Sequence, residues 1–422
     1  MSDSSTAVAP APEQPPPAAG PRPSGLRRVL QWLREGNAVM LTVYAFILAL
    51  AVGAVLIAVT NPATIKAAKY FFQAPADTFS AAWSAVSSAY SALFEGAILD
   101  PATLSSGDWT KILYPLSETL VNATPLILVG LSVGLAFRAG LFNIGGQGQI
   151  IIGAICAGYV GFAWHLPVGV HLLAALVAGT LGGALWGGVA GWLKARTGAH
   201  EVITTIMLNY IALYLLAYLL TVNGFQRPGS NQAISKVIDD NARLPHLLGS
   251  ALTVHAGLLV ALAAAAVVGW MLKRSQLGFT LRAVGANPSA ARTAGMDIER
   301  NKIVVMLIAG GLAGLAGCSQ ILGTNTAIYP TIDAGIGFNG ITVALLGRGK
   351  PWGTVLAGLL FGALTSGGTV MQVNTHTSIE LVTVLQSVIV VFIAAPALIS
   401  AVFRTRGTAE GIGQSIATGW NG

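Results

Sequence analysis

Charged side chains are scarce in this chain. They make up 9% of its 422 residues, whereas soluble domains carry about 25%. Apolar residues account for 54%, and there are 51 glycines. So few charges cannot cover the surface of a soluble domain of this length. The composition therefore predicts a polytopic membrane protein.

Clusters of reactive or metal-binding side chains are also lacking. The only two cysteines, Cys156 and Cys318, fall far apart in apolar segments, which excludes a disulfide framework. The six histidines are scattered without metal-ligand spacing. The sequence contains no recognisable combination of nucleophile, base and orienting group. The Gly335-x-Gly337-x-x-Gly340 string resembles a dinucleotide-binding motif, but no strand precedes it, as such a motif requires. We therefore expect no metal, no cofactor and no covalent chemistry in this chain.

Long apolar runs are abundant, and each predicted span is about the length needed to cross a bilayer. They predict an all-α fold of about ten transmembrane helices. The expected spans are 38–59, 113–137, 149–165, 170–193, 203–222, 251–272, 303–322, 327–347, 353–372 and 379–400.

The distribution of positive charge predicts the orientation. Alternate threading leaves few of the 23 basic residues outside, namely Lys66, Lys69, Lys111, Arg227, Lys236 and Arg243. All the others fall inside, as the positive-inside rule requires. Both termini should therefore be cytoplasmic. The net charge of +7 belongs to loops beside apolar blocks, with no basic and aromatic stripe, so we expect no nucleic-acid partner.

Five regions follow from these patterns. Residues 1–25 are rich in Pro, Ala and Ser and should form a disordered cytoplasmic tail. The first transmembrane helix occupies 26–60, and the permeation core with its polar loop at 273–302 occupies 112–401. Residues 402–422 form a second cytoplasmic tail. Between 61 and 111, Phe79, Trp83, Val86, Tyr90 and Leu93 recur at helical spacing. This predicts an amphipathic helix in the extracytoplasmic segment, either at the outer interface or packed on the bundle.

The 273–302 loop holds six basic and two acidic residues and cannot lie in hydrocarbon. Asn287 as N-cap, Pro288 at the first helical position and Gly295 as a stop predict a short helix of roughly 10 Å. The alanines 286, 290, 291 and 294 leave one side of it small. We therefore predict a docking element at 287–295 rather than a solvated loop.

Four separated motifs resemble ABC importer permeases of the nucleoside and simple-sugar type, in particular the longer nucleoside-permease paralogue. They are Gly140-Leu-Phe-Asn-Ile-Gly-x-x-Gly-Gln149, Glu201-Val-Ile-Thr-Thr-Ile-Met-Leu-Asn-Tyr210, Gly278-Phe-Thr-Leu-Arg-Ala-Val-Gly-x-Asn-Pro-x-Ala-Ala-x-x-x-Gly-Met296 and Gly337-Phe-Asn-Gly-Ile-Thr-Val-Ala-Leu-Leu-Gly-Arg348. The first departs from the family pattern at Gly146-Gln147, where an acidic residue is common.

The resemblance implies a permease subunit in the plasma membrane of a bacterium, and three protein partners. These are an ATPase that binds ATP and Mg²⁺, a second permease paralogue that completes the pore, and an extracytoplasmic lipid-anchored binding protein. The residues implied in ATPase coupling are Gly278, Arg282, Gly285, Asn287, Pro288, Ala290, Ala291, Arg292 and Gly295. Nucleosides are the implied substrate, with simple sugars or branched-chain amino acids as alternatives. An ion-coupled secondary transporter is a further alternative, which the absence of mid-span acidic residues disfavours.

The polar stretch 138–149 permits two interpretations. It is either a tight cytoplasmic turn or a broken helix whose backbone and amides line a cavity. Amides suit the edges of a nucleobase, and an aromatic ring suits its face. The candidates for the substrate pathway are therefore Asn122, Asn143, Gln147, Gln149, Asn209, Tyr210 and Asn339. Glu118 and Asp333 are expected toward the outer ends of their spans, in reach of water.

Overall fold

The computed structural model describes residues 38–105 and 107–394. The described residues are mostly helical and contain no β-strand, which confirms the all-α prediction. The expected tails at 1–25 and 402–422 lie outside the described residues. So do residues 26–37 of the first expected transmembrane region and residues 395–400 of the last predicted span.

Eight described helices are long and apolar enough to cross a bilayer. They are α2 (Ala38–Thr60), α6 (Trp109–Arg138), α7 (Gly146–Ala163), α8 (Val170–Thr197), α9 (Glu201–Leu219), α10 (Gly257–Arg274), α13 (Ile298–Ser319) with its π-helical extension η2 (Gln320–Thr324), and α15 (Pro351–Thr375). Two shorter apolar helices are α14 (Ile336–Leu346) and α16 (Glu380–Ala394). The remaining elements are α3 (Pro62–Ala68), α4 (Pro75–Ala97), α5 (Pro101–Leu104), η1 (Asp240–Ala242), α11 (Gln276–Ala286) and α12 (Pro288–Thr293).

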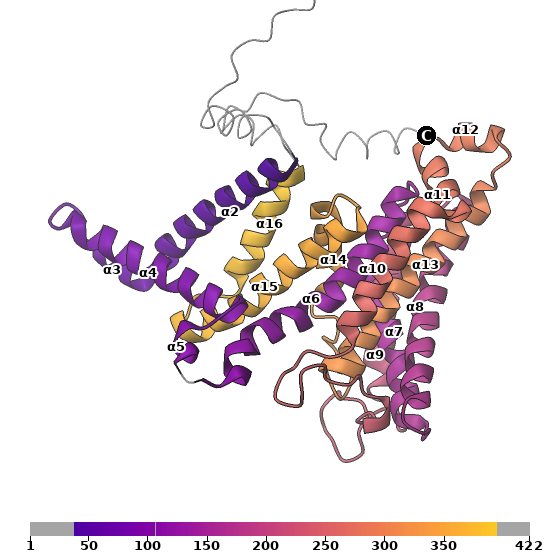
Figure 1. The fold of residues 1–422 in the computed structure, drawn as a ribbon, viewed down its shortest axis with the longest axis horizontal. Coiled ribbons are helices and arrows are strands. Elements are labelled where there is room, and N and C mark those ends of the chain that lie inside the picture. Colours follow the sequence, from indigo (N-terminus) through magenta and orange to yellow (C-terminus); the bar gives the residue numbers. More distant parts are fainter. Residues whose placement is uncertain (1–37, 106, 395–422) are drawn as a thin grey trace, which may run out of the picture.

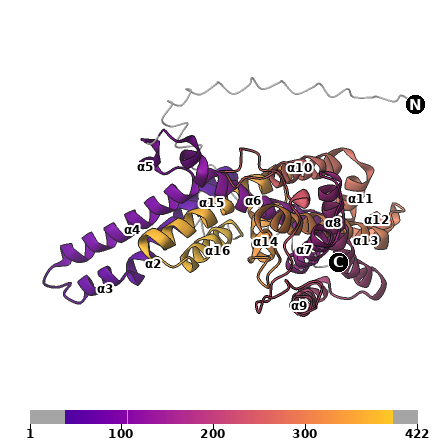
Figure 2. The same cartoon turned by 90° about the horizontal axis from the view of Figure 1, so that it is seen from below.

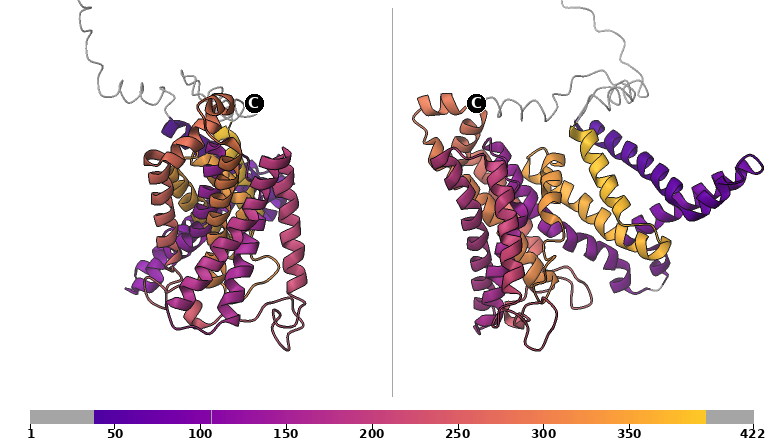
Figure 3. Two further views of the ribbon diagram at one scale, coloured as in Figure 1. Left: turned by 90° about the vertical axis from the view of Figure 1, so that its right-hand side faces the viewer. Right: turned by 180° about the vertical axis from the view of Figure 1, so that it is seen from behind.

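The helices form two groups joined by α6 and α14 (Figure 1). On one side, α2 and α4 pack with α15 and α16, as buried Ala45, Ala89 and Leu385 show. On the other side, α7, α8 and α13 make the tightest bundle. α12 stands at one end of this bundle and the 220–256 connection at the opposite end (Figure 3).

Glycines allow the close approach of α7, α8 and α13. A Cβ atom at Gly183 would lie 2.5 Å from the carbonyl oxygen of Gly310 and 2.6 Å from the Cα of Gly314. In lipid, small residues let helix backbones touch, and packing replaces the hydrophobic driving force. The four-residue spacing of glycines on α8 and α13 therefore fixes the position of the bundle's core.

The predicted 327–347 span differs from the structure. Only Ile336–Leu346 is helical there, because the chain leaves η2 in an extended connection and turns at Ala334 and Gly335, both at positive φ. The apolar composition is continuous across 327–347, so hydropathy alone could not locate this break. α14 is consequently a half-length helix.

The amphipathic helix expected in 61–111 is present as α4. Phe79 and Trp83 are exposed on its first half, whereas the second half packs against α15 and α2. The Tyr90 hydroxyl donates to the Leu50 carbonyl at 2.5 Å. Its expected place at the membrane surface stays a prediction.

Candidate functional site

The polar stretch 138–149 begins at one end of the bundle and returns into it. Arg138, the last residue of α6, donates from Nε to the Gly349 carbonyl at 3.0 Å. Gly140 then turns the chain at φ +72°. A few residues later, Asn143 Nδ2 donates to Ser132 Oγ at 3.2 Å, about 9 Å back along α6. α7 therefore starts inside the protein rather than at its surface.

Asn143 and Gln149 satisfy each other's amides. Asn143 Nδ2 donates to Gln149 Oε1 and Gln149 Nε2 donates to Asn143 Oδ1, both at 3.0 Å. The Gly145 N–H donates to Asn143 Oδ1 as well. Both side chains are almost completely buried, and buried amides need such partners. The structure therefore places these two candidates inside the re-entrant turn and not on a cavity wall.

Asn209 fastens α9 to the same turn. Its Oδ1 accepts from the Gly148 N–H at 2.8 Å, and its Nδ2 donates to the Ile144 carbonyl at 3.0 Å. The buried side of α9 is a single stripe, of which Asn209 is the midpoint: Glu201, Thr205, Asn209, Ala212 and Leu216. This stripe meets α7 and α8. The backbone of the 138–149 stretch is thus held by the Asn209 side chain of α9.

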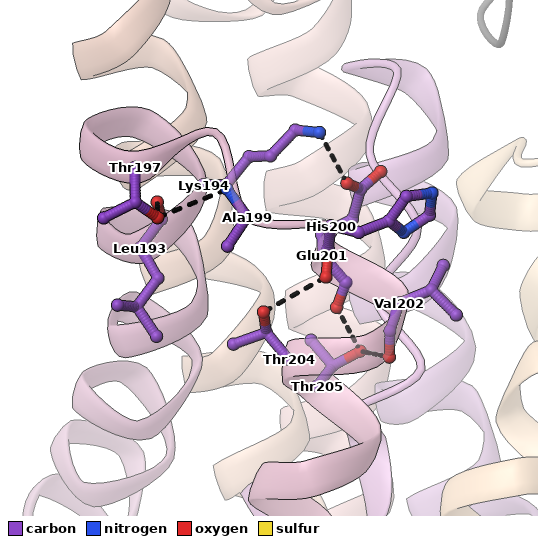
Figure 4. A network of polar contacts seen from close by, with 9 residues as sticks. All are labelled: Leu193, Lys194, Thr197, Ala199, His200, Glu201, Val202, Thr204 and Thr205. Carbon is purple, nitrogen blue, oxygen red and sulfur yellow. Dashed lines mark hydrogen bonds and ion pairs between the residues drawn. The ribbon is translucent and has the colours of Figure 1, made fainter.

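An ion pair closes the end of this stripe (Figure 4). Lys194 Nζ, on the last turn of α8, lies 2.9 Å from Glu201 Oε2, on the first turn of α9. The Glu201 side chain is 9% exposed. A cation at a helix C-terminus and an anion at a helix N-terminus both interact favourably with the helix dipoles. Thr205 Oγ1 donates to the Glu201 carbonyl at 2.7 Å. We call the Lys194–Glu201 pair the α8–α9 clasp.

The sequence places Glu201 at the start of a motif but does not by itself predict its pairing with Lys194. Lys194 and Glu201 lie on either side of a short connection between two helices. This connection turns at Gly198, which is in a left-handed conformation. Such a turn brings opposite charges at the ends of successive helices together. Removing one partner of a buried ion pair costs about 3–5 kcal/mol, so the clasp holds the start of α9 in place.

The starts of α7 and α14 meet beside Asp333. Gln147 Nε2 donates to Asp333 Oδ2 at 3.1 Å, and the backbone of Gly337 lies directly against that of Gln147. Asp333 is 5% exposed, so the expectation that it reaches water at a span end is wrong. Two helix N-termini carry partial positive charge, which explains how a carboxylate is tolerated there. Asn339 lies one turn into α14 and is half-buried.

The two remaining pathway candidates lie elsewhere. Tyr210 follows Asn209 but points away from the bundle and is 54% exposed. Asn122 lines a cavity of about 560 Å³ between α4, α6 and α15, together with Glu118 and Tyr114. The seven candidates therefore do not converge on one pocket within this single chain.

The expected docking element is α12, preceded by the unpredicted helix α11. Asn287 caps α12 by accepting from the Ala290 N–H at 3.0 Å, Pro288 begins it, and Gly295 follows it at φ +81°. The missed start of α11 is the Ser275 N-cap, whose hydroxyl accepts from the Gly278 N–H.

Burial corrects part of the expected docking face. Ala291 is 4% exposed and packs with Val284 and Ile298 of this chain, so it cannot meet a partner. Gly278 and Gly285 also face inward, against α10 and the end of α6 respectively. Ala290 and Arg292 of α12 and Arg282 of α11 are exposed.

No group of three possible metal ligands occurs within residues 38–105 and 107–394. The buried polar groups Asn143, Gln149 and Asn209 hold helices and turns together.

Comparisons with known proteins agree with this architecture. Residues 116–394 match the family described as the branched-chain amino acid transport system / permease component. The chain is 39% identical to the guanosine ABC transporter permease protein of Bacillus subtilis, over 74% of this chain and 86% of that protein. It is 37% identical to the glucose ABC transporter permease protein of Haloferax volcanii, over 66% and 76% of the two chains.

A third relative is the nucleoside ABC transporter permease protein of Lactococcus lactis, at 35% identity over 67% of this chain and 80% of that protein. No solved structure matches. The family match covers the whole re-entrant core from α6 to α16, and the chain belongs to the branched-chain amino acid transport system / permease family, as the membrane-spanning, non-enzymatic subunit of an ABC importer.

Proposed function

We propose that this chain forms half of the pore of an importer for nucleosides. The observation that carries the proposal is the 39% identity to a guanosine permease over 86% of that protein. A second relative, 35% identical, is also a nucleoside permease. An exposed aromatic side chain at Tyr210 is in keeping with a planar aromatic substrate.

The proposed assembly contains four kinds of subunit. A second, shorter permease completes the pore, an ATPase binds ATP with Mg²⁺ and a lipid-anchored protein delivers the substrate. The exposed side of α12, with Ala290 and Arg292, is the proposed contact with the ATPase. It lies at the end of the bundle that we expect to be cytoplasmic, opposite the 220–256 connection (Figure 1). ATP-driven movement of α12 would then alternate the access of the pore.

Simple sugars are the second candidate substrate class, because a relative at 37% identity is a glucose permease. The test is the uptake of labelled guanosine, glucose and leucine by cells that produce the complete transporter and lack their own carriers. We expect saturable, ATP-dependent uptake of guanosine that glucose and leucine do not inhibit. Glucose uptake without guanosine uptake would replace the nucleoside assignment with the sugar assignment.

A further inference from the structure

The side of α9 that faces away from the bundle differs from an ordinary lipid-facing surface. α9 stands at the edge of the α7–α13 group (Figure 2) and is held by its single buried stripe. Tyr210, Tyr214 and Tyr218 follow one another at every fourth position on the opposite side. They are 54%, 70% and 65% exposed.

Within residues 38–105 and 107–394, the hydroxyls of these tyrosines have no hydrogen-bond partner. No hydrogen bond joins any of them to another group in the part of the chain that the structure describes. Tyr218 lies at the end of α9, where tyrosines are common at headgroup level. Tyr210, however, is about 13 Å from the first residue of α9, and Tyr214 is about 7 Å from the last. If this face met lipid, both hydroxyls would lie at a depth where hydrocarbon offers no partner.

α8 provides the comparison within the same bundle. Its outward residues at matching intervals are Leu173, Val177, Leu181, Leu185 and Val189, all aliphatic and all exposed. This is the composition that lipid favours. Val189, at 41% exposure, lies about 12 Å from the last residue of α8, close to the depth of Tyr210, yet carries no polar atom. The outward side of α9 also exposes Ile203, Met207 and Ile211, but its row of tyrosines has no counterpart in the aliphatic row of α8.

Close packing against another helix is not the best account of that environment. The most closely packed helices in this protein, α8 and α13, approach through glycines, and α9 has no glycine to offer a helix of another subunit. A wall of the transport path supplies both water for the hydroxyls and room for the rings.

We propose that Tyr210, Tyr214 and Tyr218 of α9 line the water-filled path and that their rings stack on the planar aromatic heterocycle of the transported molecule. The ligand class rests on the proposed nucleoside import. The tyrosines stand one helical turn, about 6 Å, apart along α9. A base could thus pass from one ring to the next while each hydroxyl is hydrated or bonded to the sugar.

Thiol labelling in the complete transporter tests the position of this face. Tyr210→Cys and Tyr214→Cys are treated in membrane vesicles with a hydrophilic thiol reagent, with and without ATP. Val189→Cys is the matched control, because Leu181 and Leu185 line a cavity. The parent chain sets the background, since Cys318 is buried and Cys156 is partly buried. We expect at least one condition in which both tyrosine positions label ten times faster than Val189→Cys.

Labelling at the Val189→Cys rate under every condition would show that the face meets lipid and would overturn the proposal. Labelling that appears only when the chain is separated from its partner subunits would also overturn it, because the face would then be a subunit contact.

Guanosine should slow the labelling, which tests the ligand class. Ring removal by Tyr214→Leu should lower guanosine uptake at subsaturating concentration about tenfold, the effect of one lost stacking contact. Tyr214→Phe, which keeps the ring, should lower it much less. Equal losses in both variants would overturn the stacking role. Failure of the parent transporter to import guanosine would instead refute the proposed substrate and leave the labelling result standing.

Discussion

At the scale of single residues, His255 shows how burial selects a protonation state. It lies just before α10, 1% exposed, and its Nδ1 accepts from the Gly257 N–H at 3.1 Å. A backbone N–H can only donate, so Nδ1 carries no proton and the ring is neutral. Burial, with a smaller contribution from His246, lowers the pKa of His255 from 6.5 to about 4.

This pKa predicts the sign of a pH effect. Between pH 6.5 and 4 the unfolded chain binds a proton at His255 that the folded chain does not bind. The free energy of unfolding should therefore fall as the pH falls through this window, by at most about 3 kcal/mol. The thermal midpoint of the purified protein at pH 7 and pH 5 measures it. His255→Gln should reduce the pH dependence, and His246→Gln should retain most of it. An unchanged pH profile in His255→Gln would contradict the prediction.

Residue types were predictable from the sequence, but their partners were not. The sequence marked Asn143, Gln149 and Asn209 as unusual amides within apolar surroundings. Their hydrogen bonds join each other and the turn, because the chain re-enters the bundle at Gly140 and brings Gly148 to Asn209. This depends on tertiary contacts sixty residues apart. A motif can therefore indicate an important polar residue while leaving open whether it binds substrate or the protein itself.

At the scale of helices, long spans were predictable to within a few residues and breaks were not. The Asn287-Pro288 start of α12 was read correctly, since the cap is local chemistry. The break before α14 was missed because the residues around it are apolar. α14 and the segment before it are sheltered by α6 and α7, so their stability comes from neighbours and not from their own pattern.

Two adjacent glycines of α13 provide an element-scale prediction. A Cβ at Gly310 would collide with the carbonyl oxygen of Gly183 on α8, whereas one at Gly311 would lie 3.5 Å from Thr180 Cγ2, an ordinary contact. Gly310→Ala should therefore lower stability by about 3 kcal/mol, and Gly311→Ala should change it little. Thermal midpoints and the yield of monodisperse protein in detergent measure both. Similar behaviour of the two variants would show that α8 and α13 separate easily.

At the scale of the whole molecule, the helix proposed to contact the ATPase is fixed to the bundle by its inner side. Ala291 packs with Val284 of α11 and Ile298 of α13. A push on the outer side of α12 would therefore reach α13, which glycine contacts hold against α8. Sequence could locate this helix, but the side that faces outward depends on how α11 and α13 flank it.

Coupling is tested on the exposed side. Ala290→Asp adds a charge that would be desolvated without a partner in an ATPase groove, at a cost of several kcal/mol. We expect normal amounts in the membrane, loss of the ATPase on purification and loss of uptake. Ala290→Ser, of similar size and uncharged, should retain both. Ala291→Asp would not test this contact, because Ala291 is buried and the charge would disrupt the packing of α12 on α11 and α13. Normal transport by Ala290→Asp would remove α12 from the ATPase contact.

The half-length of α14 has a consequence for how the protein is made. Its 11 residues extend about 16 Å, roughly half the hydrocarbon thickness, and a buried carboxylate precedes it. During synthesis this segment cannot partition into lipid as an independent span, because its extended backbone would lack hydrogen-bond partners there. It has to enter against walls that already exist. α6 and α7, which provide those walls, leave the ribosome earlier, so the order of translation matches the order in which shelter becomes available.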